Sequence, residues 1–185
     1  MQFLKRCLRL EALEDRMVLD ASPALVADIN PGGGSDPSYC VPVGNIIFFG
    51  ADDGSGGVEL WKSDGTEGGT VLVKDIRPGS GFSSPSVLTN VNGTLFFRAY
   101  DGTSGVELWR SDGSDSGTVQ VKDIHPGSGG STPDHLTNVN GTLFFRANDG
   151  VNGSELWKSD GTESGTVLVK DIWPGSLPIH RNLPI

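Results

Sequence analysis

Short apolar runs recur along most of this chain, and turns rich in Gly, Asp and Asn separate them. The pattern is clearest in the middle of the chain, with runs at 87–91, 94–99, 106–111 and 118–124. These runs are rich in β-branched and aromatic residues, which favours a strand in each. Asn92-Gly93 lies between the first two runs, and an Asn-Gly pair in that position is a strong hairpin signal because both turn residues need positive φ. The pattern predicts a unit of four short antiparallel strands.

Within these runs the apolar residues are consecutive. Leu95, Phe96 and Phe97 follow one another, as do Val71, Leu72 and Val73. Successive side chains of a strand point to opposite faces of the sheet. The strands of a sheet with one solvent-exposed face would alternate apolar and polar residues. We therefore expect both faces of each sheet to be covered.

The unit repeats along the chain. Glu-Leu-Trp occurs at 59–61, 107–109 and 155–157, so the period is 48 residues (109 − 61 = 157 − 109 = 48). We divide residues 23–176 into a partial unit and three further units, at 23–45, 46–94, 95–142 and 143–176. A fixed period of this size is typical of stacked or radial repeat architectures.

The predicted fold is all-β, an array of four-stranded antiparallel blades of the β-propeller type. An open solenoid of the same units is the alternative. Three full units with a further strand at 25–29 would give thirteen strands. That is about three blades, whereas propellers usually have about four to eight. We expect an incomplete ring whose apolar end faces are covered either by homo-oligomerisation or by further repeats of a longer protein.

The two ends of the chain lack the repeat. Residues 1–22 contain no Gly or Pro, and apolar residues recur there at roughly helical spacing. We expect a short helix or a disordered leader, without the long uncharged apolar stretch of an ordinary secretory signal. Residues 177–185 depart from the repeat, and we interpret them as the aberrant end of a truncated or frameshifted array.

Charge and composition limit the classes of partner that we expect for this chain. The net charge is −9, which disfavours binding to nucleic acid or to an anionic membrane surface. No apolar run is long enough for a membrane-spanning helix, so we expect no membrane insertion. Two cysteines are too few for a disulfide framework.

Two segments carry a resemblance to known bacterial families. Glu107–Gly113, continued through Val121–Ile124, resembles the ELWxxDGT repeat, which is similar to hyalin-like repeats, and the middle copy departs from it only in having Ser114 for Thr. Residues 9–19 (RLEALEDRMVL) resemble the LEPR-XLL segment that opens many large bacterial surface proteins. The resemblance implies propeller blades in an extracellular or cell-surface protein.

Several residues are candidates for binding. The position after the fourth strand varies among units, and its occupants Arg77, His125 and Trp173 are the predicted ligand contacts, since loops on a rigid scaffold often carry binding. The motif tryptophans are predicted to be structural, with sugar stacking as the alternative; they are Trp61, Trp109 and Trp157.

Two sets of aspartates lie next to glycine. Asp64, Asp112 and Asp160 are predicted to shape the third-to-fourth-strand turn. Asp53, Asp101 and Asp149 are the calcium candidates, although turn formation explains an Asp-Gly pair and the spacing is not that of a calcium loop. We otherwise predict no cofactor.

No nucleophile elbow, phosphate loop or zinc-binding helix motif is present, and we expect no enzymatic activity. The predicted function is an adhesion or protein-interaction scaffold whose partner is a protein or a glycan. The first alternative is a lectin that closes a propeller by oligomerisation. The second is a sialidase or other glycosidase, which the scattered arginines disfavour.

Overall fold

The computed structural model describes residues 24–174, so the predicted leader (1–22) and tail (177–185) lie outside the described residues. The described chain consists of strands, turns and loops, without a helix. Accordingly, nothing in residues 24–174 is a helix of the length and hydropathy needed to cross a membrane.

In the described residues, twelve strands form three antiparallel sheets of four strands, and in each sheet the strands pair in sequence order. Sheet 1 contains β1 (Ser38–Val43), β2 (Ile46–Asp52), β3 (Val58–Ser63) and β4 (Val71–Lys74). Sheet 2 contains β5 (Ser86–Val91), β6 (Thr94–Tyr100), β7 (Val106–Ser111) and β8 (Val119–Lys122). Sheet 3 contains β9 (Asp134–Val139), β10 (Thr142–Asn148), β11 (Ser154–Ser159) and β12 (Val167–Lys170). The prediction of an all-β fold built from four-stranded antiparallel units is confirmed.

Two details of the strand prediction were wrong. Residues 25–29 form no strand, because the three sheets already contain their four strands and this segment has no partner. The fourth strand of sheet 2 ends at Lys122 and does not continue to Ile124. The reason is that the Ile124 amide donates to the Glu107 carboxylate, 3.2 Å away, and therefore leaves the ladder.

The hairpin turns follow their sequence signals. Asn92 and Gly93 both have positive φ, at 52° and 90°, as the turn between β5 and β6 requires. Phe97 pairs with Trp109 across β6 and β7, and a register shift follows between β7 and β8 at Leu108 and Trp109. The same shift occurs at the Leu-Trp pairs of sheets 1 and 3.

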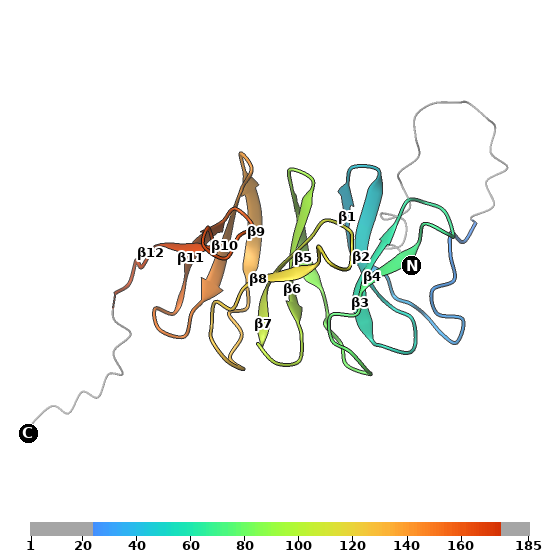
Figure 1. Cartoon of the computed structure of the whole chain (residues 1–185), viewed down its shortest axis with the longest axis horizontal. Helices are drawn as coiled ribbons and strands as arrows, with labels where there is room; N and C mark the ends of the chain where they lie inside the picture. The colour runs from blue at the N-terminus through green and yellow to red at the C-terminus, as the bar shows by residue number, and fades with distance from the viewer. Residues whose placement is uncertain (1–23, 175–185) are drawn as a thin grey trace, which may run out of the picture.

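The sheets follow one another along the long axis of the molecule, with β1, β5 and β9 as neighbours (Figure 1). Two hydrophobic cores fill the spaces between them, one joining sheets 1 and 2 and one joining sheets 2 and 3. Leu95 and Phe97 belong to the first core and Phe96 to the second, so the consecutive apolar residues serve opposite faces. Sheets 1 and 3 lie at opposite ends, and residues 24–174 form an open array (Figure 1).

Candidate functional site

The contact between one sheet and the next is the most elaborate repeated feature, and we call it a junction. The face of a sheet toward the next sheet in sequence is its outgoing face, and the opposite face is its receiving face. Phe48 and Leu60 on the outgoing face of sheet 1 pack with Phe97 and Trp109 on the receiving face of sheet 2. The second junction repeats this with Phe96 and Leu108 against Phe145 and Trp157, at positions 48 residues later.

The glutamate of Glu-Leu-Trp fastens each junction. Glu59 is 2% exposed and accepts hydrogen bonds from the Ile76 amide at 2.9 Å and from Ser83, through its amide at 2.9 Å and its hydroxyl at 2.6 Å. Ser83 lies in the loop that leads into sheet 2, and the Tyr100 amide of that sheet donates to the Ser83 carbonyl. The glutamate therefore ties one sheet to the start of the next.

The second junction uses the same bonds. Glu107 is fully buried and accepts from the amides of Ile124, His125 and Ser131 and from the Ser131 hydroxyl. Burial raises the pKa of Glu59 and of Glu107, and the hydrogen bonds from the two serines oppose that rise. A buried carboxylate with several donors is costly to disturb, because its loss leaves those donors without partners.

Basic side chains of the outgoing face reach the turn between the third and fourth strands of the next sheet. Lys62 Nζ donates to the Gly113 carbonyl at 2.8 Å, and Lys74 Nζ lies 3.3 Å from Asp115 Oδ1. Lys122 Nζ donates to the Thr166 carbonyl at 3.1 Å in the second junction. The outgoing face thus combines an apolar centre with a basic rim.

The turn itself is held by its own side chains. Asp64 Oδ1 accepts from the amide and the hydroxyl of Thr66, at 2.9 and 2.7 Å. Asp112 accepts from Ser114 in the same way, and Asp160 accepts from Thr162. Ser114, the single departure from the motif, therefore forms the same two hydrogen bonds as threonine. The side-chain hydrogen bond from the neighbouring hydroxyl is the first cause that lowers the pKa of each of these aspartates.

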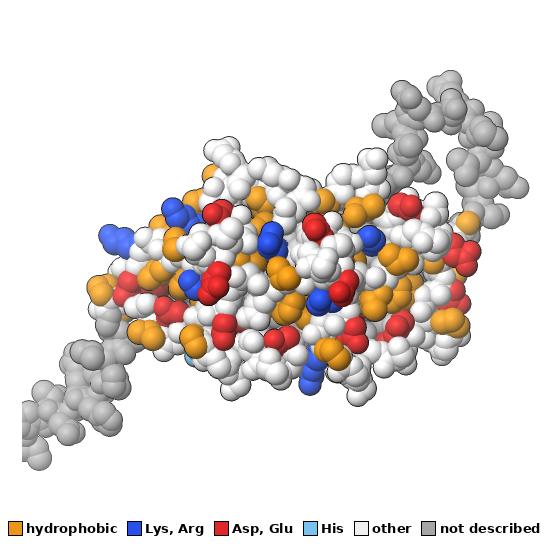
Figure 2. All heavy atoms as spheres, in the orientation of Figure 1, with side chains coloured by type: hydrophobic (Ala, Val, Ile, Leu, Met, Phe, Trp, Pro, Cys, Tyr) orange, Lys and Arg blue, Asp and Glu red, His pale blue; other side chains and the backbone are white. Residues whose placement is uncertain are grey.

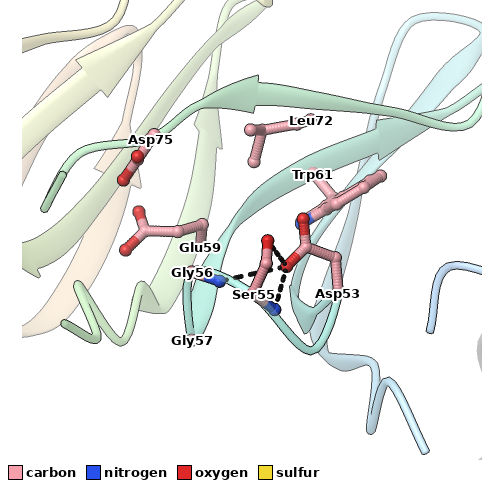
Figure 3. A pocket seen from close by; sticks show the side chains of 8 residues that line it. All are labelled: Asp53, Ser55, Gly56, Gly57, Glu59, Trp61, Leu72 and Asp75. Carbon is pink, nitrogen blue, oxygen red and sulfur yellow. Dashed lines mark hydrogen bonds between the residues drawn. The ribbon is translucent and has the colours of Figure 1, made fainter. Parts of the chain in front are cut away.

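The motif tryptophans lie in two environments. Trp109 and Trp157 are each 7% exposed and belong to the junction cores. Trp61, on sheet 1, is half-buried and lines a small hollow with Asp53, Glu59 and Asp75 (Figure 3). In this view the carboxyl of Asp53 lies beside the Trp61 ring (Figure 3).

The structure places the predicted ligand contacts in three separate loops, after β4, β8 and β12, and does not bring them together. The Arg77 guanidinium stacks over the Tyr100 ring of sheet 2, 4.8 Å from its centroid. The His125 imidazole lies so close to Gly150 of sheet 3 that a Cβ there would collide with it. Trp173, by contrast, is 77% exposed. Two of these positions are therefore engaged in junctions, and one is open.

The calcium candidates form hydrogen bonds within their own turns. Asp53 accepts from Ser55 and Gly56, and the backbone hydrogen bond from Ser55 is the first cause of its lowered pKa. Burial acts to raise the pKa of Asp101 and Asp149, but hydrogen bonds from their turns outweigh it and lower both. Among residues 24–174 no three His, Cys, Asp or Glu side chains are grouped so as to hold a metal ion. Calcium binding stays a prediction.

Sequence reasoning missed the serine that completes each glutamate clamp. Ser83 and Ser131 lie 24 residues after their glutamates. Serine recurs with the period of the repeat at 35, 83 and 131, and that recurrence could have identified it.

On the side shown in Figure 2, acidic, basic and apolar side chains are interspersed, without a large field of one sign. Comparison of this chain with protein-family models, with curated proteins and with solved structures finds no match. The functional argument therefore depends on the junctions and on the surfaces that the three sheets leave open.

Proposed function

We propose that this chain is an extracellular interaction scaffold of the ELWxxDGT type, built from β-propeller-type blades and presenting its loops to a protein partner. The observation that carries the proposal is the repeated junction. Two junctions use the same glutamate–serine clamp and equivalent apolar residues. A repeat whose units contact only their neighbours is suited to holding loops in a fixed array, which is a common basis of binding by repeat proteins.

Adhesion of the full chain to candidate surfaces tests this proposal. Beads coated with the folded chain should adhere to cells or to extracellular proteins more strongly than beads coated with the heat-unfolded chain. Adhesion that does not depend on folding would contradict a scaffold function, because an unfolded chain presents no fixed loops.

Glycan binding is the second candidate, favoured by the hollow around Trp61 (Figure 3). An indole face beside carboxylates suits a neutral sugar, which stacks on the ring and donates its hydroxyls. The three carboxylates of the hollow disfavour an anionic sugar. Burial raises the pKa of Glu59, and the charge of Asp75 also raises it. Neutral glycans on an array should bind the chain, and Trp61→Ala should abolish that binding. The variant keeps Trp109, which lies in the core of the first junction.

A sialidase would need several arginines around one substrate carboxylate. Arg77 stacks on Tyr100, Arg98 donates to Ser86 and Pro133, and Arg146 pairs with Asp134 at 3.3 Å. No arginine lines the hollow around Trp61. These separate partners support the choice of a binding function over a glycosidase.

A further inference from the structure

The outgoing face of sheet 3 has the composition of the faces that form junctions, but none of the sheets in residues 24–174 covers it. Its apolar residues are exposed: Val139 46%, Leu156 42%, Val169 44% and Ile172 70%. The equivalent residues of sheet 2, Val91, Leu108, Val121 and Ile124, are all buried in the second junction. The same sequence pattern therefore leaves an apolar face open at this end (left in Figure 2).

Within the described residues, the clamp of sheet 3 is also incomplete. Glu155 accepts one hydrogen bond, from the Ile172 amide at 3.3 Å, in the part of the chain that the structure describes. Glu59 and Glu107 each accept further bonds from a serine of the following loop. At the aligned position after Glu155 the sequence has Ile179, which has no hydroxyl.

The missing serine has a counterpart at the other end of the molecule. Ser35 precedes sheet 1 as Ser83 precedes sheet 2, and its carbonyl accepts from the Asp52 amide at 3.0 Å as that of Ser83 accepts from Tyr100. Asp36, which follows it, has φ 43°, and the equivalent Ser84 has φ 48°. Positive φ is unfavourable for such residues, so this loop holds the junction conformation although no sheet precedes it within residues 24–174.

The receiving turn of sheet 1 is open as well. A Cβ on Gly113 would lie 3.2 Å from the Phe48 ring, and a Cβ on Gly161 would lie 3.1 Å from the Phe96 ring. Around the equivalent Gly65 nothing lies within 4 Å of that point. On sheet 3 the Phe144 ring, half-buried, is the counterpart of the two phenylalanines.

We propose that the outgoing face of sheet 3 docks on sheet 1 of a second copy of this chain, forming a third junction. Ser35 of the second copy then donates to Glu155, and Phe144 packs on the turn at Gly65. Lys170 meets Glu67, as Lys74 meets Asp115 within one chain. A symmetric contact between two outgoing faces is disfavoured, because it would place Lys158 and Lys170 of both copies together.

Two features define how the copies meet. Asp28–Pro31 align with Asp171–Pro174, so only one of these segments can occupy the new junction. Ile172 already donates to Glu155, so the segment of the first copy occupies the junction and residues 28–31 of the second copy move aside. Trp173 of the first copy then replaces Asn30 beside Gly54 of the second. Phe49 and Ala51 at the centre of the receiving face are already buried, so docking uses its rim: the turn at Gly65, the loop at Ser35 and exposed Leu72.

Matched variants of the full chain test this proposal. Leu156→Asp disables the outgoing face, and Ser35→Asp places a carboxylate against Glu155 at the receiving side. Val151→Asp is the control, since Val151 is 78% exposed on the turn between β10 and β11 and outside the face. Thermal unfolding and circular dichroism of each variant verify that the fold is intact.

Sedimentation velocity over a wide range of concentration is the measurement. The parent chain and Val151→Asp should associate beyond the 19.5 kDa monomer, and each disabling variant should weaken association at least about tenfold. A mixture of Leu156→Asp and Ser35→Asp should form a dimer, because each retains one competent face. A parent chain that is monomeric at every concentration, or association that neither variant weakens, would overturn the proposal. Ligand binding by monomeric Leu156→Asp tests the proposed function separately.

Discussion

The outgoing faces of sheets 2 and 3 are built from nearly the same residues and lie in different surroundings. Leu108 is fully buried and Leu156 is 42% exposed, although each is the central residue of Glu-Leu-Trp. Ile124 is 4% exposed and Ile172 is 70% exposed. The difference shows that burial in this protein is a property of the junction and not of the single sheet, so each sheet depends on its neighbour.

The largest expected difference comes from the two leucines. Leu108→Ala removes a side chain from a closed core and should lower the free energy of unfolding by about 2–5 kcal/mol. Leu156→Ala should cost less than about 1 kcal/mol in the monomer, because that side chain is already partly in water. Chemical denaturation of both variants at low protein concentration measures the two values. Equal losses would contradict the difference between the faces.

The glutamates should differ next. Glu107→Ala removes the acceptor of buried donors. Each buried donor left without a hydrogen-bond partner should lower the free energy of unfolding by about 1–3 kcal/mol. Glu155→Ala loses the one exposed hydrogen bond that Glu155 accepts within residues 24–174, and it should change stability little. Glu107→Gln keeps one acceptor oxygen and should fall between them. If the two alanine variants were equally stable, the clamp would not hold the junction.

The pH dependence follows from the buried glutamates. Burial raises the pKa of Glu59 and Glu107 above the ordinary value of 4.5. The folded chain therefore binds more protons than the unfolded chain between the ordinary and the raised value. Their contribution to stability is fully present below the ordinary pKa and is lost as pH rises through the raised one. Replacing Glu107 by Gln should reduce this fall in stability, measured by denaturation across pH.

The turn aspartates should act in the opposite direction. Hydrogen bonds from the neighbouring hydroxyl and amide lower the pKa of Asp64, Asp112 and Asp160. Their contribution is present above the ordinary aspartate pKa and is lost as pH falls through the lowered value. Carboxyl titration by NMR should show all three below ordinary aspartate. Titration at the ordinary value would mean that these hydrogen bonds do not persist in solution.

The smallest effect is expected at Ser114, the one departure from the repeated turn. Ser114→Thr restores the motif, and both residues offer the hydroxyl that bonds to Asp112 and accepts from the Gly117 amide. The melting temperature should change little, whereas Ser114→Ala should lower it. A large gain from threonine would show that its methyl group, and not the hydroxyl, matters in this turn.

Much of the fold could be predicted from sequence because the signals were local. The Asn92-Gly93 turn and the run from Leu95 to Phe97 predicted the hairpin and the two covered faces. The clamp could not be predicted in this way, because Glu59 and Ser83 meet only when two sheets stack. The segment at 25–29 was predicted as a strand from its apolar residues, but a strand also needs a partner, and local sequence does not supply one. Arg77 and His125 are predicted as ligand contacts because their position varies among the units. The structure packs each against the next sheet, a contact that the local sequence does not reveal, and ligand binding by them stays a prediction.

Amide hydrogen exchange at two equivalent residues tests the central claim most directly. In both, the isoleucine amide donates to the glutamate of its own sheet, Ile124 to Glu107 and Ile172 to Glu155. Measured by NMR on the monomeric Leu156→Asp variant, exchange should be at least about tenfold slower at Ile124, which corresponds to about 1.4 kcal/mol of additional protection. Equal exchange at the two amides would contradict the account, because the hydrogen bond alone, and not the neighbouring sheet, would then set the protection.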